Sequence, residues 1–223
     1  MSKIVIFGEG KIADEAYFYL TNDSPHEIAA FTADADYISK KEKFGLPIIP
    51  FEEILDRYPP DDNKMFVALG YQNLNKLRAE KYRECKEKGY SLISYVSSKT
   101  GNFGNVEIGD NCFILDNATM QPCCRIGNNV TIWSNNLIGH HSVVEDHCYI
   151  AGNVTISGNT TIGAYCFIGV NACIGHELQI GEECMIGARS LITKSTEPKS
   201  VFIEQDTEKF RLDSSSFVKM TRL

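Results

Sequence analysis

Hydrophobic positions change their spacing near the middle of the 223-residue chain. In the first part, short apolar runs alternate with longer amphipathic stretches, as expected when buried parallel strands alternate with helices that cover them. The expected strands are Ile4–Phe7, Ile28–Phe31, Met65–Leu69 and Leu92–Val96, and the expected helices are Lys11–Leu20, a segment that begins at Pro50, and Gln72–Lys88. This alternation predicts a parallel sheet with helices on its faces, so we assign residues 1–96 to a small Rossmann-like α/β domain.

The second part of the chain has a strict period of six. An aliphatic residue or Met occupies every sixth position from Ile108 to Ile192. Four places after most of these comes a small side chain, which lies two residues before the next aliphatic and therefore points to the same side of a short strand. Five of the eight cysteines occupy this slot, which identifies them as small buried hydrophobic residues. A short fixed period predicts a solenoid whose units bury their apolar sides against each other.

This pattern resembles the hexapeptide-repeat family, which folds as a left-handed parallel β-helix with three hexapeptides per coil. The resemblance covers residues 102–194 and implies a β-helix domain over 97–194, followed by a C-terminal tail over 195–223. Four asparagines, Asn117, Asn135, Asn153 and Asn171, are 18 residues apart and are expected at one corner, since Asn tolerates left-handed backbone. The tail has apolar patches at Val201–Ile203 and Phe217–Met220, which we expect to pack on the β-helix or on a neighbouring subunit.

Hexapeptide proteins are mostly acyltransferases that use acetyl-CoA or a related thioester. A Rossmann-like domain followed by a β-helix is similar to the nucleotide-sugar N-acetyltransferases, typified by the UDP-4-amino-sugar enzyme of the bacillosamine pathway. The stretch Gly139–Asp146 matches that family's catalytic stretch, which implies that His140 is the general base. A histidine, with an ordinary pKa of about 6.5, can take a proton from the attacking amine. His141 stands where the family has aspartate, and the family often has an acidic residue in place of Gly139.

The resemblance also implies where acyl-CoA binds: along the β-helix between two subunits of a homotrimer. Tyr149 falls on the position of a second family histidine near the thioester, and Gly158 and Ala188 lie at corners farther along. We expect the backbone N–H of Gly158 to lie near the thioester carbonyl. One outward-facing column is rich in large apolar groups, and we expect a partner subunit, or alternatively the tail, to cover it. Its members are Phe113, Thr131, Tyr149, Phe167 and Met185.

The N-terminal segment Gly8–Ala13 carries a GxGxxA pattern between a predicted strand and a predicted helix. Such glycines permit a tight turn, and the following helix N-terminus attracts phosphate. The resemblance implies a nucleotide-linked amino sugar as ligand, with UDP, dTDP and GDP left open. The implied contact residues are Gly8, Gly10, Lys11, Asp34, Asp36, Gly70 and Asn73. The stretch Tyr71–Arg78 is polar enough to add sugar or phosphate contacts, although it also fits a solvated helix start.

Composition and motifs argue against several other kinds of partner and function. The net charge of −7 gives no electrostatic reason to expect nucleic acid or an anionic membrane as partner. Without a 20-residue apolar span or a signal peptide, the expected location is the cytoplasm. No metal is expected, because His140 and His176 lack the third histidine that a zinc site of β-helix carbonic anhydrases needs. Two alternatives stay open: an acyltransferase for another small amine or hydroxyl acceptor, and a non-catalytic β-helix protein that senses nucleotides.

Overall fold

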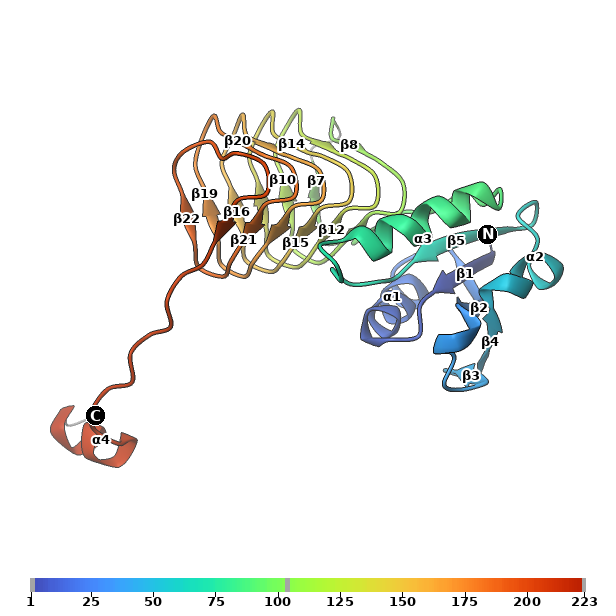
Figure 1. Cartoon of the computed structure of the whole chain (residues 1–223), viewed down its shortest axis with the longest axis horizontal. Coiled ribbons are helices and arrows are strands. Elements are labelled where there is room, and N and C mark those ends of the chain that lie inside the picture. The colour runs from blue at the N-terminus through green and yellow to red at the C-terminus, as the bar shows by residue number, and fades with distance from the viewer. Residues whose placement is uncertain (1–2, 103–104, 222–223) are drawn as a thin grey trace.

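The computed structural model describes residues 3–102 and 105–221 (Figure 1). An α/β unit at the N-terminus is followed by a long solenoid of stacked coils, and the C-terminal segment extends away from the last coil. None of the described helices is long and apolar enough to cross a bilayer.

The α/β unit contains one five-stranded sheet with the order β3-β4-β2-β1-β5, in which only the edge strand β3 is antiparallel. Alternate residues of β1 enter two separate cores: Ile4 and Ile6 pack with α1, whereas Val5 and Phe7 pack with Cys85 of α3. The predicted helices and the first three predicted strands are present, with shifts at their ends, and β4 is a parallel strand that the sequence analysis did not predict. The elements are β1 (Lys3–Phe7), α1 (Lys11–Asn22), β2 (Glu27–Ala33), β3 (Glu42–Lys43), β4 (Leu46–Pro50), α2 (Ile54–Arg57), β5 (Asn63–Val67) and α3 (Lys76–Glu87), with 3₁₀ turns at Ala35–Tyr37 and Phe51–Glu53.

The strand expected over Leu92–Val96 is divided between the two parts of the molecule. Leu92 forms a parallel bridge with Met65 of β5. Tyr95 and Val96 form β6, which pairs in parallel with β9 of the solenoid. The Tyr95 N–H donates to the Cys112 carbonyl at 2.8 Å, so the backbone has already entered the first coil.

The solenoid is a parallel β-helix with three sheets of two-residue strands. Together with the hexapeptide period, these sheets fit the left-handed β-helix expected from the sequence. The first sheet contains β6 (Tyr95–Val96), β9 (Phe113–Ile114), β12 (Thr131–Ile132), β15 (Tyr149–Ile150), β18 (Phe167–Ile168), β21 (Met185–Ile186) and β23 (Val201–Phe202). The second contains β7 (Gly101–Asn102), β10 (Thr119–Met120), β13 (Leu137–Ile138), β16 (Thr155–Ile156), β19 (Cys173–Ile174) and β22 (Leu191–Ile192). The third contains β8 (Glu107–Ile108), β11 (Arg125–Ile126), β14 (Val143–Val144), β17 (Thr161–Ile162) and β20 (Gln179–Ile180).

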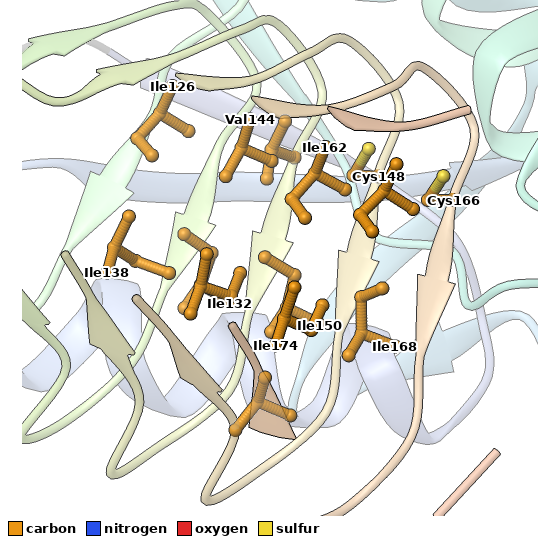
Figure 2. Packing of buried hydrophobic residues seen from close by; sticks show 14 of the residues in the cluster. Ile126, Ile132, Ile138, Val144, Cys148, Ile150, Ile162, Cys166, Ile168 and Ile174 are labelled. Carbon is orange, nitrogen blue, oxygen red and sulfur yellow. The ribbon is translucent and has the colours of Figure 1, made fainter. Parts of the chain in front are cut away.

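The periodic aliphatic residues fill the solenoid interior, as Figure 2 shows for Ile132, Ile150 and Ile168 of the first sheet. Cys148 and Cys166 lie in the same interior, near Ile162 in Figure 2, and all eight cysteines carry free thiols. The corners repeat with the same period: one residue in every six, from Asn111 to Arg189, has a φ between 51° and 66°. The expected asparagine column lies at one of these corners, with φ values of 58–63°.

The apolar column on the outside of the first sheet is covered differently from the expectation. Phe113 and Tyr149 are only 2% and 5% exposed within a single chain. Tyr19 and Phe66 pack against Phe113, and Tyr71 packs against Tyr149 and Phe167. The prediction of a partner subunit or the tail as the cover of this column is therefore wrong over these coils: the N-terminal unit covers it.

The C-terminal segment contacts the β-helix over its first part, up to Thr207, whose hydroxyl accepts from Arg189 at 3.2 Å. β23 pairs with β21, which extends the first sheet by one strand. Beyond it the chain runs out to α4 (Ser214–Thr221), which stands away from the rest of the molecule in Figure 1. Phe217 and Met220 on α4 are exposed, so this apolar patch does not pack on the β-helix of its own chain.

Candidate active site

His140 lies at the corner between the second and third sheets, with an exposed side chain. Its backbone N–H donates to Oε1 of Gln121 at 2.9 Å, which ties this corner to the preceding coil. The imidazole lies against Gly158, one coil farther on, where a Cβ would come within 2.7 Å of the ring Nε2. The His176 ring, two coils from His140, lies 6.2 Å away between centroids. The missing side chain at Gly158 is thus what leaves room for the His140 ring.

His141 pairs directly with His140. Its φ of 60° places it in the left-handed corner conformation, and its own N–H donates to the Pro122 carbonyl at 3.1 Å. The Nδ1 atoms of the two rings are 3.1 Å apart, a hydrogen-bond distance. The sequence placed His141 beside the candidate base but gave no indication of this ring-to-ring bond.

The backbone N–H of Gly158 has no acceptor within the described parts of the chain, although the carbonyl of Gly158 accepts from the Glu177 N–H at 3.1 Å. Gly139 lies directly beneath that nitrogen, and a Cβ on Gly139 would collide with it. A free N–H beside an imidazole is an arrangement that can serve a developing oxyanion and a proton transfer together.

A pocket of about 600 Å³, which we call the nucleotide pocket, opens at the carboxyl ends of β1 and β2. Gly8 and Gly10 form its floor, and Asp34, Tyr37, Gln72 and Lys81 stand around it. Gly8 has a φ of 135° and lies so close to the Ala68 carbonyl that a Cβ would be 2.7 Å from its oxygen. A Cβ at Gly10 would meet nothing within 4 Å, so the start of α1 is open to a ligand.

Asp34 does not stand alone in this pocket. Its Oδ1 accepts from Lys81 Nζ at 3.0 Å, and Lys81 also pairs with Glu84 at 2.9 Å. Burial opposes the charge on Lys81, but the hydrogen bonds that Lys81 donates to Glu84 and Asp34 outweigh it and raise the pKa of Lys81. The pocket therefore carries a fixed ammonium group beside a carboxylate. The sequence analysis missed Lys81, because this residue lies in the amphipathic helix predicted over Gln72–Lys88, where nothing distinguished it from the other charged residues.

The other expected nucleotide contacts lie around the pocket rather than in its lining. Lys11 is exposed at the start of α1, and Asp36 is exposed in the 3₁₀ turn after β2. Gly70 and Asn73 lie in the loop before α3, where Asn73 has a φ of 49°. This loop contributes Leu69 and Gln72 to the lining.

Arg78 was a candidate for sugar or phosphate contact, and the structure gives it a different place. It is 1% exposed, and its Nη2 donates to the carbonyls of Asn129, His147 and Cys148 at 3.0–3.2 Å. Its Nη1 donates to the Gly70 carbonyl at 3.4 Å. Loss of hydration lowers the pKa of Arg78 to about 10, which leaves it cationic at neutral pH. Arg78 thus fastens α3 and the Gly70 loop to the β-helix.

Two expected acyl-CoA contacts do not meet His140 within one chain. Tyr149 lies on the first sheet beneath Tyr71, and its hydroxyl accepts from Trp133 Nε1 at 2.5 Å. Ala188 lies at the corner between the first and second sheets, beside Arg189. Of the three expected residues, only Gly158 adjoins His140. Across residues 3–102 and 105–221, no three His, Cys, Asp or Glu side chains gather closely enough to hold a metal ion.

Comparison with known proteins matches residues 105–140, 124–158 and 159–194 to the family described as bacterial transferase hexapeptide (six repeats). These residues are hexapeptide repeats. The match confirms the hexapeptide repeats over residues 105–194, and it covers the corner that carries His140 and Gly158. No curated protein matches the sequence of the chain.

Solved structures share the fold over nearly the whole chain. A histidine-to-asparagine mutant of perosamine N-acetyltransferase from Caulobacter crescentus, in complex with CoA and GDP-perosamine, is 20% identical with a TM-score of 0.80, covering 90% of this chain and 93% of its own. The acetyltransferase domain of PglB from Neisseria gonorrhoeae FA1090 is 20% identical with a TM-score of 0.75, covering 89% and 94%. WeeI from Acinetobacter baumannii AYE is 19% identical with a TM-score of 0.75, covering 90% and 96%. The likeness extends beyond the hexapeptide repeats, so the order of the two parts is shared as well.

Proposed function

We propose that the protein transfers an acyl group, most simply acetyl, from acyl-CoA to the amine of a nucleotide-linked amino-deoxy sugar. The observation that carries this proposal is the corner where the His140 imidazole adjoins the free N–H of Gly158. The fold shared with an N-acetyltransferase in complex with CoA and GDP-perosamine supports the same chemistry. A thioester carbonyl beside Gly158 would have both an oxyanion donor and a base within reach.

In this mechanism the sugar amine attacks the thioester carbonyl directly. The amine loses a proton to Nε2 of His140 as the new C–N bond forms, and the negative charge that develops on the carbonyl oxygen receives a hydrogen bond from the Gly158 N–H. The tetrahedral intermediate then collapses, the C–S bond breaks, and the leaving CoA thiolate takes the proton from His140. The base returns to its neutral state, and the products are the amide and free CoA.

In this proposal the nucleotide pocket binds the second substrate, the nucleotide-linked amino sugar. Gly10 leaves the N-terminus of α1 open to a diphosphate, and Lys81 adds a fixed positive charge nearby. Asp34, whose carboxylate already accepts from Lys81, retains capacity to accept from a ribose hydroxyl. Lys11, Asp36, Gly70 and Asn73 are proposed to contact the outer parts of the ligand.

We propose that the two parts of the site, the His140 corner and the nucleotide pocket, come together between copies of the chain. The hydrogen-bond and ring partners of His140 lie in the β-helix, at Gln121, His141, Asn159 and His176. The nucleotide pocket belongs to residues 7–81, and its domain packs on the first sheet, opposite the corner of His140. A homotrimer, in which one subunit's pocket faces another's His140 and CoA lies between β-helices, would join them. In such an assembly Ala188 and Tyr149 would lie on the surfaces that adjoin the acyl-CoA cleft.

A direct assay tests the proposed function. The purified protein is incubated with acetyl-CoA and each of several UDP-, dTDP- and GDP-linked amino sugars, and CoA release is followed together with the mass of the sugar nucleotide. We expect thiol release matched by an acetyl mass increase for one nucleotide class. Thiol release without that increase, or no turnover with any amino sugar, would reject the proposed function.

Mixing two inactive variants tests the shared site. His140→Asn removes the base and Gly10→Asp blocks the pocket, so each homotrimer should be inactive. Trimers reassembled from both variants should recover activity, because some sites combine an intact base with an intact pocket. No recovery in mixed trimers that are verified by mass spectrometry would place both parts of the site in one subunit.

A further inference from the structure

The bond between His140 and His141 restricts which tautomers the two rings can have. Their Nδ1 atoms are 3.1 Å apart, and both side chains are exposed. In a neutral imidazole one ring nitrogen carries hydrogen and the other has a lone pair, so one Nδ1 must donate and the other must accept.

Only one of the two arrangements leaves a base on His140. If His141 donates, Nδ1 of His140 uses its lone pair as the acceptor, and the hydrogen of the His140 ring then sits on Nε2. No lone pair remains for the amine proton. If His140 donates instead, its Nε2 keeps a free lone pair beside Gly158, where a thioester would lie.

We propose that His141 is a positioning residue that accepts the Nδ1–H of His140 and so holds the base in the tautomer with a free Nε2. This inference rests on the proposed acyl transfer for its functional meaning. His141 stands where the resembled family has an aspartate, so a neutral ring here takes over an acceptor role that a carboxylate can fill. Unlike a carboxylate, the ring accepts only while its Nδ1 is unprotonated.

The backbone fixes the positions of both rings. Two groups of the preceding coil accept hydrogen bonds from this corner. The Gln121 side chain accepts from the backbone N–H of His140, and the Pro122 carbonyl accepts from the backbone N–H of His141. The φ of 60° at His141 turns the chain so that two consecutive side chains point toward each other instead of to opposite sides. Gly158 leaves the space that the donating ring occupies.

Nitrogen-15 NMR of histidine-labelled protein near pH 8, where imidazoles with ordinary pKa values are neutral, reads the tautomers without any activity. The His140 signals are identified by their absence from His140→Asn. We expect the Nδ1–H form of His140 in the wild type and in His141→Asn, and the Nε2–H form in His141→Ala. An Nε2–H form of His140 in the wild type would overturn the proposal. Because this measurement needs no turnover, an inactive protein with Nδ1–H on His140 would refute the acyl transfer and leave the pairing intact.

Kinetics separate positioning from a merely structural role. Asn carries its Oδ1 on Cγ, as His carries Nδ1, and it tolerates the left-handed corner, so His141→Asn should keep kcat within about threefold. His141→Ala should lower kcat roughly tenfold or more with little change in either KM. Asn153→Ala changes an exposed left-handed corner residue elsewhere and should match the wild type. Equal losses in His141→Asn and His141→Ala, or full kcat in His141→Ala, would contradict the proposal.

Discussion

The imidazole of His140 occupies the space that a side chain at Gly158 would need: a Cβ there would lie 2.7 Å from both Cε1 and Nε2. The two residues are 18 positions apart in sequence and one coil apart in the β-helix. A histidine and a glycine in one corner column therefore work as a pair, since the second determines where the first can lie.

Gly158→Ala tests this pair. The new Cβ should displace the His140 ring and crowd the thioester, so we expect kcat to fall by roughly 10–100-fold, with the fold intact. Gly152→Ala is the matched control: it lies at the same place in the preceding hexapeptide, and its Cβ would meet only the Ser134 carbonyl, at 3.5 Å. Steady-state kinetics and circular dichroism of both variants are the measurements. Equal activity of the two variants would show that the His140–Gly158 contact is unimportant.

Gly10→Asp tests the nucleotide pocket. Gly10 has ordinary extended backbone and no atom within 4 Å of a Cβ, so the substitution strains nothing. Aspartate is also a favourable N-cap for α1, so the melting temperature of the free protein should stay the same or rise slightly. Its negative charge at the open helix start should abolish the thermal shift that a nucleoside diphosphate gives the wild type. An undiminished thermal shift in the variant would show that the nucleotide binds at another site.

Arg78→Ala tests the connection between the two parts of the molecule. The change leaves a cavity and removes the donor from four backbone carbonyls, so we expect the free energy of unfolding to fall by about 2–4 kcal/mol. Arg83→Ala, an exposed position on the same helix, should cost under about 0.5 kcal/mol. Urea unfolding monitored by fluorescence measures both. Similar losses for the two variants would argue against Arg78 as the fastening residue.

His147 makes stability depend on pH. It is buried in a corner column where Asn129 Nδ2 donates to its Nδ1 at 2.9 Å, and burial lowers the pKa of His147 to about 4. The unfolded chain titrates near 6.5, so between these values the unfolded state binds more protons and acid favours unfolding. We expect the His147 contribution, roughly 1–3 kcal/mol, to be complete above pH 6.5 and to be lost as the pH falls toward 4.

His147→Asn extends the column of Asn111 and Asn129 with a side chain that does not titrate. Its free energy of unfolding should therefore change less between pH 7 and pH 4.5 than that of the wild type. Urea unfolding at several pH values gives the comparison. An unchanged pH dependence would assign the acid sensitivity to other groups.

The period of six was enough to predict a solenoid, because the aliphatic positions from Ile108 to Ile192 obey it and each coil contacts only its neighbours. The resemblance to the hexapeptide-repeat family then implied that this solenoid is a β-helix. His140 and Gly158 are 18 residues apart, the length of one coil, so the same register puts them in one corner column. Long-range packing was not visible in any local pattern. The cover of Tyr149 comes from Tyr71 in a distant loop, and the burial of Arg78 depends on carbonyls of two later coils. The orientation of two rings, on which the His140–His141 bond depends, was likewise beyond the sequence.

The most direct test of the proposed acyl transfer is the turnover of His140→Asn beside the wild type, with acetyl-CoA and the amino-sugar nucleotide that the wild type accepts. Removing a general base should lower kcat by roughly 10²–10⁴-fold, while the melting temperature and the nucleotide-induced thermal shift stay unchanged. A His140→Asn protein that acetylates the sugar nucleotide at the wild-type rate would contradict the assignment of His140 as the base.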